Sequence, residues 1–128
     1  YSTTEGKLRM ANIKSTFNDF LDAFCARKLD AASSLLVDDF EFVGPLAQAK
    51  SKAEFVEKMR PLLPIVTGYR MLAQMAEGDD VCSLYEFCVE TPKGAGAIPM
   101  VEWTTFRGDK LARSRVLFNT PELMALIS

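Results

Sequence analysis

The apolar residues near the start of the chain recur with the period of a helix. They lie at positions 0, +3, +4, +7 and +8 of one stretch and are Phe17, Phe20, Leu21, Phe24 and Cys25. This spacing places them along one side of an amphipathic helix that buries that side. We therefore predict a helix over about residues 4 to 27.

Two shorter elements follow this helix. Asp30 can accept a backbone N–H that would otherwise be unpaired, so we expect it to cap a short helix in the sequence AASSLLV, residues 31–37. Phe40 and Phe42 then alternate with acidic residues, and this period of two is typical of a half-buried strand. The Gly44-Pro45 pair predicts the end of the strand.

A third helix is predicted from its capping signal. The sequence SKAE at residues 51–54 has the Ser-x-x-Glu form of a capping box. Phe55 and Met59 follow it on one helical face. Pro61 and Pro64 prevent a long continuation, so we expect the helix to end by about residue 63.

The second half of the chain has the pattern of four strands. Gly, Asp and Pro residues, which supply tight-turn geometry, separate them at 78–80, 92–96 and 108–109. We predict a meander of antiparallel strands, then a short final helix that Thr120 caps before Pro121. The strand segments are GYRMLAQMAE (68–77), VCSLYEFCVE (81–90), AIPMVEWTTF (97–106) and KLARSRVLFN (110–119).

Helices first and an alternating meander last are typical of the α+β class, in which helices cover one face of a bent antiparallel sheet. An error of one residue in the register would move Glu102 from the inner face to solvent. Glu86, Glu90, Arg113 and Arg115 fall on the outer face, which suits solvent or a polar subunit interface. The inward residues predicted by alternation are Val81, Ser83, Tyr85, Phe87 and Val89; Met100, Glu102, Thr104 and Phe106; and Ala112, Ser114, Val116 and Phe118.

Composition and charge predict one globular domain over residues 1–128. Apolar residues make up 48 % and charged residues 25 % of the chain, and the net charge is −2. These ordinary values argue against disorder, and the mixed charges do not supply the basic surface that binds nucleic acid. No apolar run reaches the roughly 20 residues of a membrane-spanning helix. We therefore expect a cytoplasmic protein that binds neither nucleic acid nor membranes.

Histidine is absent from the sequence. This excludes Ser-His-Asp and Cys-His nucleophiles, His metal sites and a His general base. Cys25, Cys82 and Cys88 lack the Cys-x-x-Cys spacing, and we expect them to be buried, reduced thiols. No metal and no cofactor are predicted.

The sequence FLDAFCARKLDAASSLLVDDFEFVGPL, residues 20–46, resembles the opening of the NTF2-like superfamily. The shared pattern is a helix ending before Leu29-Asp30, a short helix, Asp38-Asp39, an aromatic strand and Gly44-Pro45. The segments AEGDDVCSLYEF and WTTFRGDKLARSRVLFN resemble its central and closing hairpins, so the likeness covers about residues 10–120. Members include ketosteroid isomerases, SnoaL-like polyketide cyclases, scytalone dehydratase and limonene epoxide hydrolase.

The resemblance implies a cone-shaped α+β barrel, in which a curved antiparallel sheet wraps around the N-terminal helices. It also implies a deep apolar pocket at the open end and, in many members, a homodimer packed through the outer sheet face. Val101, Trp103 and Thr105 fall on that outer face, where an exposed apolar stripe would favour a homodimer. The alternative is that Trp103 packs only on the protein's own core.

Several catalytic positions of these relatives are not kept. Ketosteroid isomerases use a carboxylate base beside an oxyanion site made by a Tyr and a neutral acid. The base position matches Gly44 here, the Tyr position matches Phe20 approximately, and the acid position matches Glu102. The His-Asp pair of the dehydratases is missing, and Val116 takes the approximate place of the last Asp of limonene epoxide hydrolase.

Glu102 and Tyr85 are therefore the candidate catalytic residues, as acid or base and as hydrogen-bond donor. A carboxyl group in an apolar pocket should have a raised pKa, because desolvation penalises its charged form. Asp38 and Asp39 could pair for acid–base work, although such neighbours are usually solvated or capping residues. The predicted pocket residues are Phe20, Phe24, Phe42, Gly44, Phe55, Met59, Phe87, Met100, Thr104, Phe106, Ser114, Val116 and Phe118, with Asn119 as a further polar candidate.

Three functions stay open on the sequence alone. The first is a cofactor-independent isomerase, cyclase or hydrolase that acts on a small apolar substrate, polycyclic ones included. The second is a non-catalytic binder of a hydrophobic ligand, since an apolar cavity with few polar groups is typical of small-molecule sites. The third is a protein-interaction adaptor.

Overall fold

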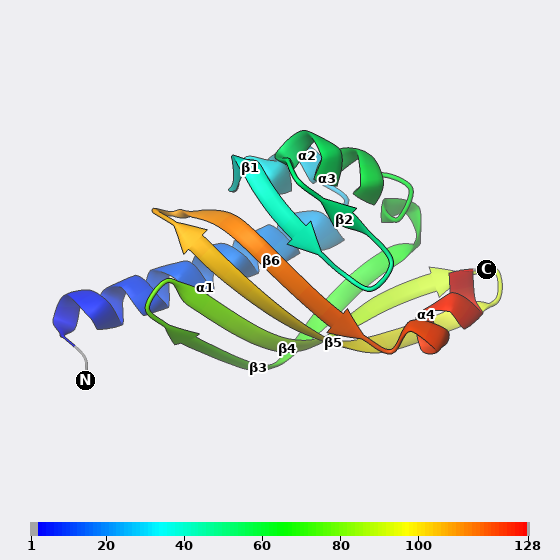
Figure 1. Ribbon diagram of the computed structural model, residues 1–128. Helices are drawn as coiled ribbons and strands as arrows, with labels where there is room; N and C mark the ends of the chain where they lie inside the picture. Colours follow the sequence, from blue (N-terminus) through cyan, green and yellow to red (C-terminus); the bar gives the residue numbers. More distant parts are fainter. Residues whose placement is uncertain (1–2, 128) are drawn as a thin grey trace.

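The computed structural model describes residues 3–127, so residues 1, 2 and 128 of the predicted domain lie outside the described residues. Figure 1 shows the arrangement of the elements. In chain order they are α1 (Thr4–Cys25), α2 (Leu29–Ser33), β1 (Leu36–Val43), β2 (Gln48–Ala49), α3 (Lys52–Met59), the 3-10 helix η1 (Leu63–Ile65), β3 (Val66–Glu77), β4 (Asp80–Thr91), β5 (Gly94–Arg107), β6 (Lys110–Phe118) and α4 (Thr120–Ile127).

The strands form one curved, open sheet in the order β2-β1-β6-β5-β4-β3 (Figure 1). Strands β3 to β6 are an antiparallel meander, as the sequence predicts. β1 joins this meander parallel to β6, and the short β2, which the sequence analysis did not predict, pairs antiparallel with β1. The predicted α+β class with a curved sheet around N-terminal helices is confirmed.

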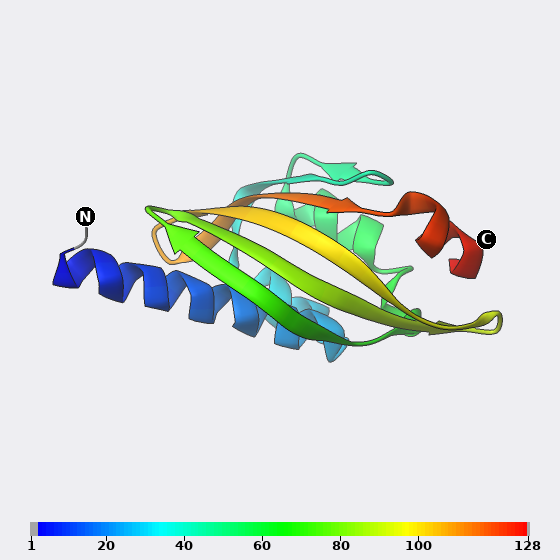
Figure 2. The same cartoon turned by 90° about the horizontal axis from the view of Figure 1, so that it is seen from below.

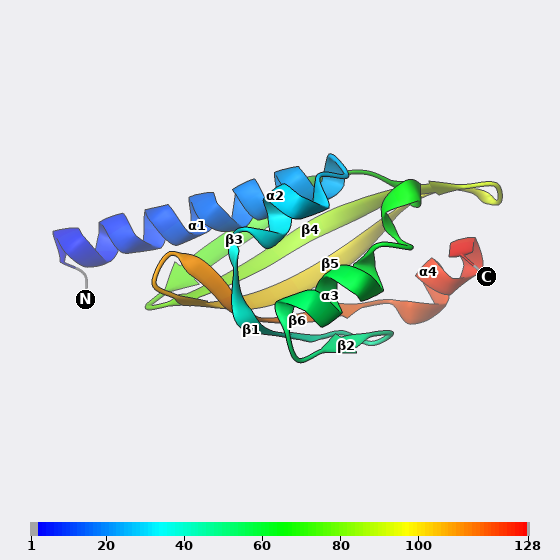
Figure 3. The same cartoon turned by 90° about the horizontal axis from the view of Figure 1, so that it is seen from above.

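The helices gather on the inner face of the curved sheet. α1 lies along β3 and β4, and α3 packs against β1 and β2 (Figures 2 and 3). α4 packs against β5, at the opposite end of the molecule from the first turn of α1 (Figure 3). No helix within residues 3–127 is both long and apolar enough to cross a membrane.

Side-chain caps fix the starts of α1 and α3. Thr3 accepts a hydrogen bond from the N–H of Gly6 at 3.0 Å, and Ser51 accepts one from the N–H of Glu54 at 3.1 Å. Glu54 in turn accepts the N–H of Lys50 at 2.6 Å, which resembles the reciprocal bond of a capping box. α3 therefore begins directly after Ser51, as the sequence predicts, but it ends at Met59, before Pro61, and not near residue 63.

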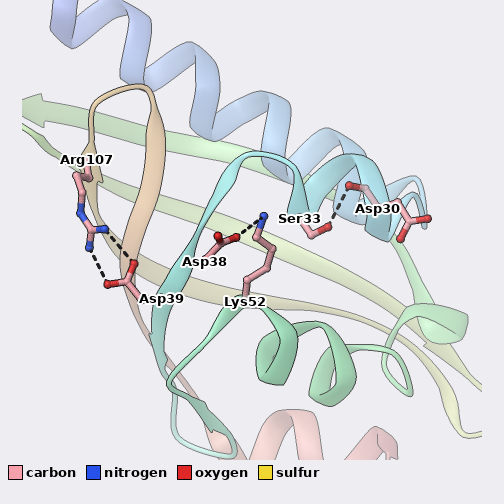
Figure 4. Close-up of polar contacts among 6 residues, drawn as sticks. All are labelled: Asp30, Ser33, Asp38, Asp39, Lys52 and Arg107. Atoms are coloured by element: carbon pink, nitrogen blue, oxygen red, sulfur yellow. Dashed lines mark hydrogen bonds and ion pairs between the residues drawn. The ribbon is translucent and has the colours of Figure 1, made fainter.

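The predicted cap at Asp30 is wrong. Asp30 lies inside the first turn of α2, which has no side-chain cap, and the last residues of AASSLLV belong to β1. Only the backbone carbonyl of Asp30 is engaged by a side chain, accepting the Ser33 hydroxyl at 3.0 Å (Figure 4). α2 starts before the predicted residue 31 because α1 already ends at Cys25. Arg27 then adopts φ 63° and turns the chain.

The cap of α4 also differs from the expectation. Oδ1 of Asn119, not the Thr120 side chain, accepts the N–H of Glu122 at 3.1 Å. Pro121 has no N–H to offer, so the first donor within reach belongs to Glu122. Asn119 is exposed and caps a helix, which corrects its assignment as a polar pocket candidate.

Glycines at tight turns set the register of the meander. Gly78 and Gly108 have φ of 60° and 66°, a region that glycine adopts without strain, and each opens a two-residue hairpin turn. The predicted inward faces of β4 and β5 are confirmed, Glu102 included. On β6, Leu111 rather than Ala112 is buried, because the pairing with β5 shifts by one residue near the turn.

Aromatic rings fix α3 over the sheet. The ring of Phe55 lies 5.2 Å from that of Phe40, 5.1 Å from that of Phe42 and 6.3 Å from that of Phe20, measured between centroids. Such pairs contribute about 0.5–1.5 kcal/mol each beyond the burial of their area. The cluster holds α1, β1 and α3 together and forms one side of the interior space described next.

Candidate functional site

A cavity of about 230 Å³ lies between the helices and the inner face of the sheet. Its lining is almost entirely apolar, and it draws side chains from both ends of the chain. The lining residues are Phe20, Leu21, Phe24, Phe42, Gly44, Leu46, Ala47, Phe55, Lys58, Met59, Leu62, Tyr85, Phe87, Met100, Glu102, Val116, Phe118, Leu123 and Ile127.

The polar part of the cavity wall is a pair of side chains on β4 and β5. The Tyr85 hydroxyl donates a hydrogen bond to Oε1 of Glu102 at 2.6 Å. The two residues are only 3 % and 4 % exposed. In the ladder Tyr85 stands opposite Met100 and Glu102 opposite Ser83, so the hydrogen bond runs diagonally between neighbouring strands on the inner face.

Burial shifts both groups toward their protonated forms. Desolvation raises the pKa of Glu102 above its usual value, although the hydroxyls of Tyr85 and Ser114 oppose this by hydrogen bonding to the carboxylate. Desolvation, together with the neighbouring Glu102, raises the pKa of Tyr85 well above its usual value. Tyr85 therefore remains a hydrogen-bond donor, while Glu102 holds a proton to higher pH than an exposed glutamate does.

Most of the predicted pocket residues line this cavity, but Thr104, Phe106 and Ser114 do not. The hydroxyls of Thr104 and Ser114 lie 2.7 Å apart in a hydrogen bond, and both residues are fully buried. Phe106 belongs to the filled core. Alternation predicts the face of a strand but not how far along it a cavity extends, which is why these three assignments fail.

Sequence reasoning missed other lining residues. Leu123 and Ile127 lie one turn apart on α4, and this spacing could have marked an inward face. Leu46 and Ala47 belong to the turn after β1, which carries no periodic signal. Lys58 could not have been found, because a lysine on an amphipathic helix ordinarily indicates the solvent side.

Gly44 lies at the mouth of the cavity. Together with Leu46, Ala47 and Lys58 it lines both the cavity and an adjoining surface depression. Its N–H donates to the carbonyl of Ala47 at 2.9 Å and closes the Gly-Pro turn. A Cβ on Gly44 would lie 3.3 Å from the ring of Phe42, so a side chain fits there after a small shift of that ring.

Asp38 and Asp39 do not form a shared acid–base site (Figure 4). Successive side chains of a strand point to opposite faces, and the two carboxylates accordingly bind different cations. Arg107 donates two hydrogen bonds of 2.9 and 3.3 Å to Asp39, and Lys52 of α3 lies 3.5 Å from Asp38. The hydrogen bonds from Arg107 lower the pKa of Asp39.

The thiols and carboxylates of the described chain do not assemble a metal site. Residues 3–127 contain no cluster of three or more His, Cys, Asp or Glu side chains that could hold a metal ion. All three cysteines are free and partly buried. Burial raises the pKa of Cys25 to about 12, so this thiol is protonated at neutral pH and is a poor nucleophile.

The outer face of the sheet carries an apolar stripe over β5 and β6. Trp103 is 53 % exposed and Leu117 is 57 % exposed, and Val101 is also exposed beside them. These three residues line a shallow groove together with Arg113 and Arg115. Trp103 therefore does not pack in the protein's own core, and that alternative is wrong.

Solved structures with this fold support the assignment of the architecture. An NTF2-like protein of unknown function from Burkholderia pseudomallei superposes with a TM-score of 0.79 at 18 % identity, over 91 % of this chain and 98 % of that chain. An LEH-like epoxide hydrolase from M. tuberculosis gives 0.78 at 13 % identity, over 92 % and 91 %. TerC, co-crystallised with polyporic acid, gives 0.78 at 20 % identity, over 91 % and 98 %.

At such identities the likeness shows the fold alone, and no curated protein matches the chain significantly. A sequence match supplies the family. The model of the SnoaL-like domain matches residues 17–114, which include the C-terminal part of α1, all of α2, α3, η1 and β1 to β5, and the start of β6. The chain therefore belongs to the SnoaL-like domain family, within the NTF2-like superfamily that its helices and curved sheet indicate.

Proposed function

We propose that the cavity binds a small apolar molecule and that Glu102 transfers a proton to or from it in a cofactor-independent reaction of the isomerase, cyclase or hydrolase type. The observation that carries this proposal is the buried 2.6 Å hydrogen bond between Tyr85 and Glu102 in an otherwise apolar wall. A buried carboxyl group costs folding free energy, and groups with shifted pKa values concentrate at functional sites.

In this proposal the two residues have different roles. Oε1 of Glu102 accepts the Tyr85 hydroxyl, and the substrate reaches the carboxyl group from the cavity that Glu102 lines. Protonated Glu102 gives its proton to a basic substrate atom, becomes a carboxylate, and recovers a proton from the substrate or from water at the end of the cycle. Tyr85 is a positioning residue, because its hydroxyl is committed to Glu102 and its raised pKa keeps it protonated.

Two proteins with the same fold give general support. One is an epoxide hydrolase, and the other, TerC, was crystallised with polyporic acid. Their names are consistent with small-molecule chemistry on this fold. Neither substrate is carried over to this chain, because one fold hosts many reactions.

A non-catalytic binder is the second candidate. Apart from the Tyr85–Glu102 pair, Lys58 is the only titratable side chain that lines the cavity within residues 3–127. No second buried carboxylate therefore stands opposite Glu102, and at the mouth the chain has Gly44 where the resemblance implies a base.

The test combines binding and turnover. A thermal-shift screen of terpenoids, steroids and aromatic polyketides is run with wild type, Glu102→Gln and Tyr85→Phe, and every hit is followed by NMR for product. We expect Glu102→Gln to bind with similar affinity but to lose about 10²- to 10⁴-fold in rate, the usual range for general acid–base catalysis. Tyr85→Phe should move the alkaline limb of the pH–rate profile to higher pH, because protonated Glu102 is the active form and a hydrogen bond that lowers its pKa is gone.

Glu90→Gln is the matched control, since Glu90 is exposed on the outer side of β4. Ligand binding without turnover that depends on Glu102 would leave the binder as the function. Failure of every ligand class to bind would contradict both small-molecule functions and favour the adaptor.

We also propose that the outer sheet face packs against a second copy of the chain. The apolar stripe at Val101, Trp103 and Leu117 is flanked by arginines on β6 and by the exposed Leu84 on β4. A two-fold axis in the interface, parallel to β5, would place β4 of each copy over β6 of its partner. The apolar stripes of the two copies would then cover each other, with the arginines of β6 at the rim.

A further inference from the structure

The size and the charges of the cavity together restrict its ligand. We infer that the site takes an amphipathic anion: an apolar body of one or two rings, buried against the aromatic wall, with a carboxylate or similar anionic group that pairs with Lys58 at the mouth. This inference rests on the proposed small-molecule function of the same cavity and specifies its ligand class.

The volume restricts the apolar body. The cavity measures about 230 Å³. An apolar protein cavity of about 150 Å³ binds benzene, whereas drug-sized ligands occupy pockets of roughly 300–1,000 Å³. The present cavity lies between these cases, which favours one or two rings over a four-ring steroid.

The charges restrict the polar end. Lys58 is the single cation in the lining drawn from residues 3–127, and it belongs both to the cavity and to the depression outside it. Its Nζ donates to the carbonyl of Gln48 and lies 3.8 Å from the carboxylate of Glu54. A ligand anion at the mouth would pair with the same Nζ and compete with an ion pair that is only loosely formed.

The deep and the outer parts of the cavity differ in charge, and this difference determines the orientation of the bound ligand. The wall around Phe20, Phe55 and Phe87 offers no charge to compensate a buried anion, so the charged group stays near solvent. Glu102 meets the uncharged end of the ligand. A cationic ligand of the same shape would place its charge beside Lys58 instead and be repelled.

The experiment uses three probes that share one naphthalene body and are similar in size: 2-naphthoate, 2-naphthylmethylammonium and 2-methylnaphthalene. Binding to the full chain is measured by calorimetry at low and high salt. We expect 2-naphthoate to bind at least about tenfold more tightly than the ammonium probe, with the preference reduced by salt. Lys58→Met should remove the preference for 2-naphthoate over the ammonium probe.

Two controls test whether the effect on binding comes from the charge at the mouth of the cavity. One control changes a charge elsewhere on the protein, and the other changes only the size of a side chain at the mouth. Lys52→Met removes a cation of the same helix that does not line the cavity and should keep the preference for 2-naphthoate. Gly44→Asp adds an anion at the mouth and should weaken 2-naphthoate at least about tenfold, whereas Gly44→Ala, which adds only the Cβ, should not.

The outcomes distinguish this inference from the proposed function. Equal binding of the three probes, or an unchanged preference in Lys58→Met and Gly44→Asp, would overturn the anion assignment and leave the small-molecule site intact. Tighter binding of a four-ring steroid than of any naphthalene probe would overturn the size assignment. If no ligand of any class binds, the proposed function itself fails.

Discussion

The two faces of β5 depart from the usual polar-out, apolar-in pattern in opposite ways. On the inner face Glu102 is almost fully buried between Met100 and Thr104, and on the outer face Trp103 and Val101 are exposed. Both departures occur on the same strand, within two residues of each other. Strand alternation decides to which face of the sheet each side chain points. The buried acidic residue and the exposed apolar residues are exceptions to the usual pattern, and they lie on the surfaces proposed to bind a ligand and a partner.

The largest contrast between the faces should appear when large side chains are truncated. Phe106→Ala on the inner face should reduce the free energy of unfolding by about 3–5 kcal/mol, because it leaves a cavity in the core. Trp103→Ala on the outer face should cost the monomer less than about 1 kcal/mol. Urea unfolding at a concentration where the chain is monomeric measures both, and equal costs would mean that the register of β5 is wrong.

A charge on the outer face should act on assembly rather than on folding. Trp103→Arg should weaken self-association at least about tenfold, because large aromatic residues dominate interface energetics. Leu8→Arg, at an exposed apolar residue of α1, is the control and should leave association unchanged. Sedimentation velocity over a concentration series provides the measurement, and a wild-type chain that remains monomeric would refute the proposed interface.

Removal of the charge from the inner face should stabilise the protein in a pH-dependent way. The folded pKa of Glu102 is raised above its usual 4.5, so the unfolded chain releases this proton first as the pH increases. Wild-type stability must then fall between the unfolded and the folded pKa. Glu102→Gln does not lose stability in this way and should be more stable than wild type near pH 7.

The stability difference for Glu102→Gln should disappear below about pH 4.5, where both states of the wild-type chain are protonated. Thermal unfolding from pH 4 to 8 measures it. Glu90→Gln, on the exposed side of β4, serves as the control and should show no comparable gain. A gain that does not depend on pH would indicate a change in packing and not the relief of a buried charge.

The smallest effect is expected at the exposed ion pair between Asp39 and Arg107. The pKa of Asp39 is lowered by the Arg107 hydrogen bonds, so its contribution is present at neutral pH and is lost as the pH falls through that lowered pKa. Because both side chains are exposed, Asp39→Asn should change the midpoint of urea unfolding only slightly. A large change that persists in 1 M salt would contradict a solvent-screened pair.

The fold was largely predictable because the spacing of apolar residues and the residue types in tight turns depend only on nearby positions in the sequence. The spacing of Phe17, Phe20 and Phe24 predicted α1, and glycines in the turns predicted the hairpins. The parallel pairing of β1 with β6 and the short β2 were not predictable, since they depend on contacts between distant segments. The predicted caps at Asp30 and Thr120 failed because each residue lies inside its helix: α2 begins at Leu29, and Asn119 caps α4.

The sequence predicted which face of the sheet carries the candidate site, but not the extent of the site. Alternation brought Glu102 and Tyr85 to the same side of adjacent strands, but it could not show that their side chains are hydrogen-bonded. It also could not show where the cavity ends, so Thr104 and Ser114 were included although they bond to each other. Lys58 and the α4 residues depend on how helices pack against the sheet, which a sequence period does not encode.

The position of β6 in the sheet affects how the protein folds. This strand is the last of the six in the sequence, yet it lies between β1 and β5 and pairs Leu111 with Leu36. Until it leaves the ribosome, β1, β2 and α3 have no strand that connects them to the meander. Pairings between distant segments slow folding, so the cavity, whose walls include residues of β6 and α4, can form only after these two elements have been synthesised.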